Sequence, residues 1–330
     1  MHFLIAHIRR FDWLLLGAIL LLMSIGLITL YSLSSTSAYP FFLRQLMWVG
    51  IGLPLLLVAS FIDFRFFRTQ SVAVLLFYLV SIVLLAAVLL MNLKVRGVEA
   101  WLRIGSFTVQ PVEAAKLALI VLLAKFFSKR HVEIYRIRHL VVSGLYVAIP
   151  TILVLAQPDL GSAMVLVSIG VVIVLFSGMK WRHMVLLVFL FAIASTVMWQ
   201  WGFAPYQKAR ITSFLNPYAD PRGAGYQTIQ SRIAVGSGQI WGKGLGYGSQ
   251  SHLNFLPEAE ADFIYAAFAE EWGFVGTLVL MGLFSIVYWR IVHIGTVAID
   301  NFSRLYAIGF ATFIFVQSFF HLGTNMGFLP

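Results

Sequence analysis

The feature that most constrains this chain is a series of apolar runs, each long enough to cross a lipid bilayer or nearly so. An α-helix rises about 1.5 Å per residue and the hydrocarbon core is about 30 Å thick, so about 20 apolar residues form a spanning helix. These runs predict an all-α polytopic membrane protein. Nine spans are expected, at residues 13–31, 45–62, 72–91, 113–127, 140–156, 160–178, 183–201, 263–289 and 304–322.

The composition excludes most soluble classes of protein. Only 11% of the residues are charged and 60% are hydrophobic, whereas soluble domains carry about 25% charged residues. Most of the basic residues behind the net charge of +10 lie in short loops between the runs, so they set topology and do not indicate nucleic-acid binding. The chain has no cysteine, which excludes disulfides, thiolate nucleophiles and cysteine-based metal sites.

The basic loops also predict an orientation. Lysines and arginines gather in alternate short loops, around residues 9–10, 65–68 and 125–138. By the positive-inside rule that side faces the cytoplasm, which places the N-terminus there. The simplest division is one membrane domain over residues 1–330, with an extracytoplasmic loop at residues 202–262.

The stretch from Arg210 to Gly273 is the place where chemistry in contact with water is expected. Its glycines, between Gly236 and Gly248, favour close approach of the backbone to a ligand. No Ser or Thr follows Lys243, so a nucleotide-binding P-loop is excluded. Five of the chain's 13 acidic residues lie near the end of this stretch: Glu258, Glu260, Asp262, Glu270 and Glu271.

Asp262 is the leading candidate for a general base. It stands where a polar loop enters an apolar helix, so partial desolvation would make its carboxylate a stronger base. A helix N-cap is an equally good interpretation of the spacing. Glu270 and Glu271 lie two turns further into the same helix, where carboxylates without partners do not persist. At least one of them should therefore face a polar cavity or a basic group such as Lys116 or Arg210.

Other ionisable residues in or near the spans have both structural and functional interpretations. Glu113 and Lys116, at i and i+3, can form an ion pair that fixes helix packing or can belong to a site. Asp159 follows Pro158 and is expected to cap the next helix. Trp101 and Arg103, in an outward loop, could hold a sugar ring and a phosphate, although such arginines usually meet lipid headgroups.

Several motifs follow one another along the chain. They include Trp101-Leu102-Arg103-Ile104-Gly105, Gln110-Pro111-Val112-Glu113-Ala114-Ala115-Lys116, Gln157-Pro158-Asp159-Leu160-Gly161, Gly223-Ala224-Gly225-Tyr226-Gln227, Phe255-Leu256-Pro257-Glu258 and Asp262-Phe263-Ile264 with Glu270-Glu271. Taken together, these motifs resemble the SEDS family of bacterial cell-wall polymerases (shape, elongation, division and sporulation). The similarity covers about two-thirds of the chain in the family's order. Val112 stands where the family usually has Ser, and Ala261 where it usually has Thr.

The resemblance implies a fold and an activity. The fold is a ten-helix bundle, of which this chain holds nine spans and the start of the tenth. The activity is that of an inverting hexosyltransferase of the bacterial inner membrane, a peptidoglycan glycosyltransferase. It uses lipid II as donor and acceptor to build glycan strands for cell-wall elongation and cell shape. The implied partner is a class B penicillin-binding protein, which supplies the transpeptidase.

The resemblance also implies site residues. The family's essential aspartate maps to Asp262, the expected base. A divalent cation, Mg²⁺ or Mn²⁺, is a possible cofactor, and no nucleotide or organic cofactor is expected. The residues expected to bind substrate are Arg103, Trp101, Glu113, Lys116, Arg210, Lys243, Glu258, Ser237 and Glu270.

Two alternatives from other functional classes remain open. The first is a transporter that flips lipid II, with Glu113, Lys116 and Glu270 lining the path. A transporter should tolerate loss of Asp262 better than loss of these charges in the spans, whereas a polymerase should show the reverse. The second is a non-catalytic scaffold for the penicillin-binding protein, which predicts that Asp262→Asn preserves growth.

Overall fold

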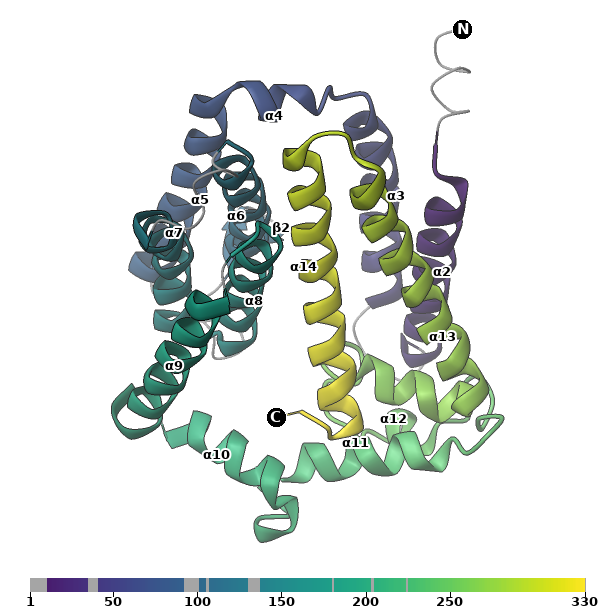
Figure 1. Cartoon of the computed structure of the whole chain (residues 1–330). Coiled ribbons are helices and arrows are strands. Elements are labelled where there is room, and N and C mark those ends of the chain that lie inside the picture. Colours follow the sequence, from purple (N-terminus) through teal and green to yellow (C-terminus); the bar gives the residue numbers. More distant parts are fainter. Residues whose placement is uncertain are drawn as a thin grey trace, which may run out of the picture. The chain divides into compact units, whose positions relative to one another are not determined.

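The chain is a polytopic, almost entirely helical membrane protein. The computed structural model describes residues 11–34, 41–91, 101–104, 107–129, 137–179, 181–202, 205–223 and 225–329. Each of the nine expected spans is a helix (Figure 1). These helices are α2 (Trp13–Ser34), α3 (Phe41–Ser60), α5 (Ser71–Met91), α6 (Pro111–Ser128), α7 (Ile137–Ala156), α8 (Leu160–Phe176), α9 (Trp181–Val197), α13 (Ile264–Val297) and α14 (Asn301–Met326).

Six of these helices are long and apolar enough to cross a membrane unaided. The other three, α6, α8 and α9, are short or charged. α8 and α9 have 17 residues each, about 26 Å at about 1.5 Å per residue. A π-helical turn, η1 (Met198–Gly202), follows α9 directly and lengthens it. α6 has 18 residues and includes Glu113, Lys116 and Lys125.

The chain forms two compact units, which are described separately. The first unit contains Met1–Ile62, Ser195–Arg290 and Phe319–Pro330, and the second contains Asp63–Ala194 and Ile291–Ser318. The single domain expected from the sequence stays a prediction about the intact protein.

The core of the second unit surrounds α6. This helix is buried on almost all sides, with Leu119, Ile120 and Leu123 fully buried, and it packs against α5, α7 and α8. A helix with no exposed face belongs at the centre of a bundle. An antiparallel hairpin of two short strands, β1 (Leu102–Ile104) and β2 (Phe107–Val109), leads into it. A short helix, α4 (Arg65–Thr69), precedes α5.

The predicted cap at Asp159 is confirmed. Its Oδ1 accepts a hydrogen bond from the backbone N–H of Ser162 at 3.0 Å, in the first turn of α8. Nearby, the Gln157 side chain donates to the backbone carbonyl of Leu85 at 2.8 Å. The polar break between α7 and α8 is therefore satisfied within the bundle, as the membrane interior requires.

The expected loop at residues 202–262, in the first unit, contains several helices. They are α10 (Pro205–Leu215), the 3-10 turn η2 (Pro217–Ala219), α11 (Tyr226–Ser237) and α12 (Ser249–His252). α11 lies beside the C-terminal end of α14 (Figure 1). Two side chains of α11 reach that end: Ser231 Oγ donates to the carbonyl of Asn325, and Arg232 Nη2 donates to that of Gly327.

Candidate active site

The site is built on a break in α13. Gly273 interrupts the helix with φ 65° and ψ −162°. Such a break leaves backbone carbonyls and amides without partners inside the helix. The carbonyls of Glu270 and Glu271 accept from the N–H groups of Lys243 and Gly244, each at 3.0 Å. Beyond the break, the N–H groups of Phe274 and Val275 donate to the carbonyls of Gln239 and Ile240, at 2.8 and 3.1 Å. Residues 239–244 thus complete the hydrogen bonding of the broken helix.

Glycines allow this segment to lie against α13. A Cβ atom on Gly238 would lie 2.0 Å from the carbonyl oxygen of Ala269, and one on Gly242 would lie 2.1 Å from that of Glu271. Gly242 also has φ 82°, which disfavours other residues. The sequence predicted close backbone approach to a ligand. In the structure, the approach of these two glycines is to α13.

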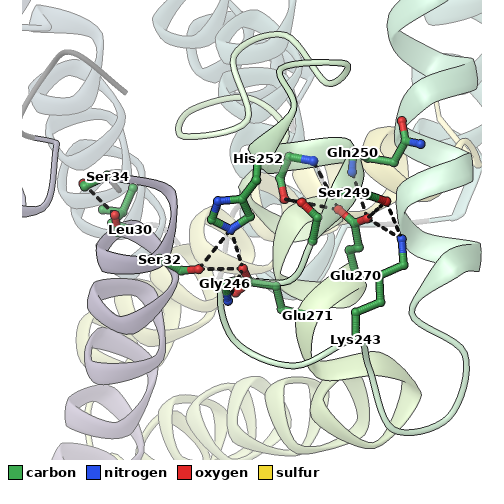
Figure 2. A network of polar contacts seen from close by, with 12 residues as sticks. Leu30, Ser32, Ser34, Lys243, Gly246, Ser249, Gln250, His252, Glu270 and Glu271 are labelled. Atoms are coloured by element: carbon green, nitrogen blue, oxygen red, sulfur yellow. Dashed lines mark hydrogen bonds and ion pairs between the residues drawn. The ribbon is translucent and has the colours of Figure 1, made fainter. Parts of the chain in front are cut away.

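Glu270 is the centre of a polar network (Figure 2). Its side chain is fully buried, and Lys243 Nζ donates to Oε1 at 2.7 Å. The N–H groups of Gln250 and Ser251 donate to its two oxygens at 2.9 and 3.2 Å. The hydroxyls of Ser237, Ser249 and Ser251 complete the set at 3.2–3.4 Å.

The network confirms that Glu270 has a basic partner and corrects which one it is. The sequence suggested Lys116 or Arg210, and the structure provides Lys243. Three residues expected to bind substrate, Ser237, Lys243 and Glu270, thus lie together. Because Glu270 is fully buried, its contacts are to the protein itself and it acts by holding the segment from Lys243 to Ser251.

Glu271 ties the same segment to α2. Its Oε1 accepts from Ser32 Oγ, from the N–H of Gly246 at 3.0 Å and from His252 Nε2 at 3.0 Å (Figure 2). Nε2 is the protonated nitrogen of His252 in this arrangement, because a carboxylate oxygen only accepts. Adjacent carboxylates on α13 therefore fasten two parts of one loop.

Asp262 lies in a tight turn just before α13. The turn begins at Glu258, an exposed residue with φ 52°, and its carbonyl accepts from the N–H groups of Ala261 and Phe263 at 3.0 and 3.2 Å. Asp262 is exposed, which corrects the partial desolvation expected from the sequence. Over the described ranges its carboxylate makes no hydrogen bond or ion pair. The N-cap interpretation is therefore not supported, and the carboxylate is available to an incoming group.

The backbone around Asp262 is held by α14. Asn325 Nδ2 donates to the carbonyl of Asp262 at 2.8 Å, and Asn325 Oδ1 accepts from the N–H of Ala266 at 3.1 Å. One turn earlier, His321 Nε2 lies 3.4 Å from the carbonyl oxygen of Ala261. No spacing rule points to these contacts, since they join residues about 60 positions apart.

The predicted pair in α6, in the second unit, is confirmed. Lys116 Nζ lies 2.7 Å from Glu113 Oε1, and the lysine is buried whereas 41% of the Glu113 side chain is exposed. Nζ also lies 5.6 Å from the ring centre of Phe313, a cation–π contact. The buried lysine therefore has its charge balanced inside the unit.

For the remaining residues expected to bind substrate, the structure gives only a position in the fold. Trp101 is half-buried just before β1. The side chains of Arg103 and Arg210 lie outside the described residues, although the backbone places Arg103 in β1 and Arg210 in α10. In the part of the chain that the structure covers, no group of three or more His, Cys, Asp or Glu side chains is arranged to hold a metal ion.

Comparisons with known proteins place the chain among bacterial cell-wall proteins. Stage V sporulation protein E of Bacillus subtilis (strain 168) is 36% identical over 331 residues, which cover 97% of this chain and 88% of the relative. The peptidoglycan glycosyltransferase MrdB of Escherichia coli K12 is 36% identical over 287 residues, which cover 87% of this chain and 76% of the relative.

A solved structure with a similar fold also comes from a protein of peptidoglycan synthesis. It is a chain from a peptidoglycan synthase complex that coordinates polymerization and crosslinking, with a TM-score of 0.78, 29% identity and coverage of 97% of this chain and 89% of that one. The family model described as cell cycle protein, for FtsW, RodA and SpoVE, matches residues 11–330. The chain therefore belongs to the FtsW, RodA and SpoVE family of cell cycle proteins.

Proposed function

We propose that this protein is a peptidoglycan glycosyltransferase that polymerises lipid II, with Asp262 as the general base. The observation that carries the proposal is the state of Asp262. Its carboxylate is exposed and without a partner in the described structure, while its backbone is hydrogen-bonded. A base must reach the proton that it abstracts and must be held in place, and this arrangement provides both.

The reaction requires few groups. The Asp262 carboxylate takes the proton from the 4-hydroxyl of the acceptor sugar. That oxygen forms the new bond to the anomeric carbon of the donor, and the bond from this carbon to the lipid diphosphate breaks with inversion. Arg210, in the same unit as Asp262, is proposed to offset the charge of the leaving diphosphate. The roles expected for Arg103 and Lys116, in the second unit, stay predictions.

A divalent cation is proposed to bind together with the diphosphate. The described residues form no cluster of three ligands, so they do not fit a cage made by protein alone. Mg²⁺ is commonly held by one or two carboxylates plus substrate phosphates. Adding a chelator to the polymerisation assay and then restoring Mg²⁺ or Mn²⁺ tests this proposal.

The proposal extends to the cellular setting. We place the protein in the bacterial inner membrane with its N-terminus in the cytoplasm, working in cell-wall elongation beside a class B penicillin-binding protein. Support comes from the similarity to a chain of a synthase complex that couples polymerization to crosslinking and from the basic loops on one side.

Polymerisation of purified lipid II, with and without the class B partner, tests the function. Glycan strands longer than the disaccharide should form, and adding the partner should increase their yield. The flippase alternative predicts instead that vesicles holding the protein transfer lipid II between leaflets and form no strands. That alternative needs Glu270 to line a path, whereas Glu270 is fully buried and hydrogen-bonded to the protein.

A further inference from the structure

We propose that Asn325 of α14 is a positioning residue that fixes the catalytic Asp262. This inference rests on the proposed function, because it concerns how the proposed base is held. Nothing in the spacing of the sequence links the two residues, which are 63 positions apart.

Asn325 contacts both sides of the start of α13. Its Nδ2 donates to the carbonyl of Asp262 at 2.8 Å, just before the helix. Its Oδ1 accepts from the N–H of Ala266 at 3.1 Å, in the first turn. The residue is only 1% exposed, so these contacts are shielded from water. One side chain therefore fixes the angle at which the turn meets the helix.

α13 needs such a partner because it lacks a cap of its own. The helix starts at Ile264, and Phe263 stands before it without a side-chain oxygen. The first N–H groups of a helix have no acceptor inside it, and a capping side chain normally supplies one. Asn325 supplies that acceptor from α14. The same amide group then uses its donor on the residue that carries the base.

Asn325 is itself fixed from several directions. Ser231 Oγ of α11 donates to its carbonyl at 2.6 Å, and its Nδ2 also donates to the carbonyl of His321 at 2.8 Å. After it, Gly327 has φ 75°, and its carbonyl accepts from Arg232 at 2.8 Å. The end of α14 is therefore a fixed support for the turn at Asp262.

This support matters because the Asp262 carboxylate has no hydrogen bond or ion pair to another described residue. Its position depends on its backbone. A displacement of about 1 Å in a reacting group can lower a rate by about 100-fold. Loss of the bond to the Asp262 carbonyl should therefore reduce turnover more than substrate binding.

Two substitutions separate positioning from helix capping. Asn325→Asp keeps an acceptor for Ala266 and remains a good cap, but it replaces the donor facing the Asp262 carbonyl with an oxygen. Asn325→Leu removes both contacts. Ser231→Ala is the matched control, because it loosens Asn325 from α11 and leaves both contacts to α13 intact.

The experiment measures lipid II polymerisation by the full chain with its partner, and amide hydrogen exchange over residues 262–267. Asn325→Asp and Asn325→Leu should each lower kcat by about 10- to 100-fold with KM within about threefold. Exchange at Ala266 should rise in the leucine variant only. Ser231→Ala should stay within about threefold of wild type.

Wild-type kcat in Asn325→Asp, or an equal loss in Ser231→Ala, would overturn the positioning role. If either result is found while Asp262→Asn is inactive, the assignment of Asp262 as the base is still supported. Full activity of Asp262→Asn would overturn the base and the positioning role together. The exchange data still report whether Asn325 holds the turn, so the two failures can be told apart.

Discussion

Lys243 Nζ lies 2.7 Å from Glu270 Oε1, and this ion pair joins the glycine-rich segment to the broken helix α13. Glu270 is fully buried, whereas 28% of the Lys243 side chain is exposed. The backbone makes the same connection, since the N–H of Lys243 donates to the carbonyl of Glu270 at 3.0 Å. Lys243 is therefore joined to the broken helix through both its side chain and its backbone.

Glu270→Ala should destabilise the protein strongly. The substitution leaves the Lys243 ammonium and the N–H groups of Gln250 and Ser251 without their acceptor. Each buried donor left without an acceptor costs about 1–3 kcal/mol. Thermal unfolding in detergent measures the effect. Lys243→Met should cost less, because Glu270 keeps its other donors, and an equal loss in both variants would contradict this account.

Gly238→Ala should destabilise the contact between the glycine-rich segment and α13. The new Cβ would lie 2.0 Å from the carbonyl oxygen of Ala269, and overpacking of this kind costs about 1–3 kcal/mol. Gly236→Ala is the control: it lies in α11, where nothing is within 4 Å of the added atom. Since alanine favours helix over glycine by about 1 kcal/mol, it should be neutral or stabilising in the same unfolding assay.

Glu258→Gly separates the backbone role of this residue from its carboxylate. Glu258 has φ 52°, a conformation that glycine adopts freely. Relief of strain and the greater entropy of unfolded glycine oppose each other, so stability should change by less than about 1 kcal/mol. If the carboxylate binds substrate, KM for lipid II should rise at unchanged stability. Glu258→Gln checks whether the charge is responsible, and an unchanged KM in both variants would remove Glu258 from the site.

Asp12 should make stability depend on pH in the acidic range. Burial alone would raise its pKa, but the hydrogen bonds and charge of Arg290 and the N–H of Leu15 lower it below the ordinary 3.8. The Asp12 carboxylate lies 2.7 Å from Arg290 Nη2 and 2.8 Å from its Nε. A lowered folded-state pKa adds stability above the unfolded value, and this is lost as the pH falls through the folded value.

The Asp12→Asn variant measures that contribution. The wild type should be more stable than the variant at neutral pH, by no more than about 1 kcal/mol because the pair is partly exposed. The difference should shrink as the pH falls below 3.8. A difference that stays constant down to acidic pH would show that the Asp12–Arg290 pair does not titrate as described.

The sequence predicted the features that depend on local pattern. The nine helices were expected because each apolar run is continuous. The pair of Glu113 and Lys116 was expected from the i, i+3 spacing, and the cap at Asp159 from its place after Pro158. In each case the partners lie within one turn of each other, so the geometry of a single helix fixes the contact.

Features that depend on distant residues were missed. Residues 263–289 were read as one continuous span, although Gly273 breaks it, because a single glycine is also compatible with an unbroken helix. The acceptor for Lys243 lies 27 positions away and the anchor of Asp262 lies 63 positions away. Only the folded chain brings such residues together. The exposure of Asp262 was likewise missed, since it depends on how the turn at Glu258 is folded.

The most direct test of the account is the rate at which Asp262→Asn polymerises lipid II in the presence of its class B partner. The substitution keeps the shape of the side chain and removes its basicity. A general base typically contributes about 100- to 10,000-fold to the rate. The variant should therefore polymerise lipid II at about 1% of the wild-type rate or less, a loss of about 100-fold or more. Its unfolding temperature should equal that of the wild type. Polymerisation at the wild-type rate would contradict the assignment of Asp262.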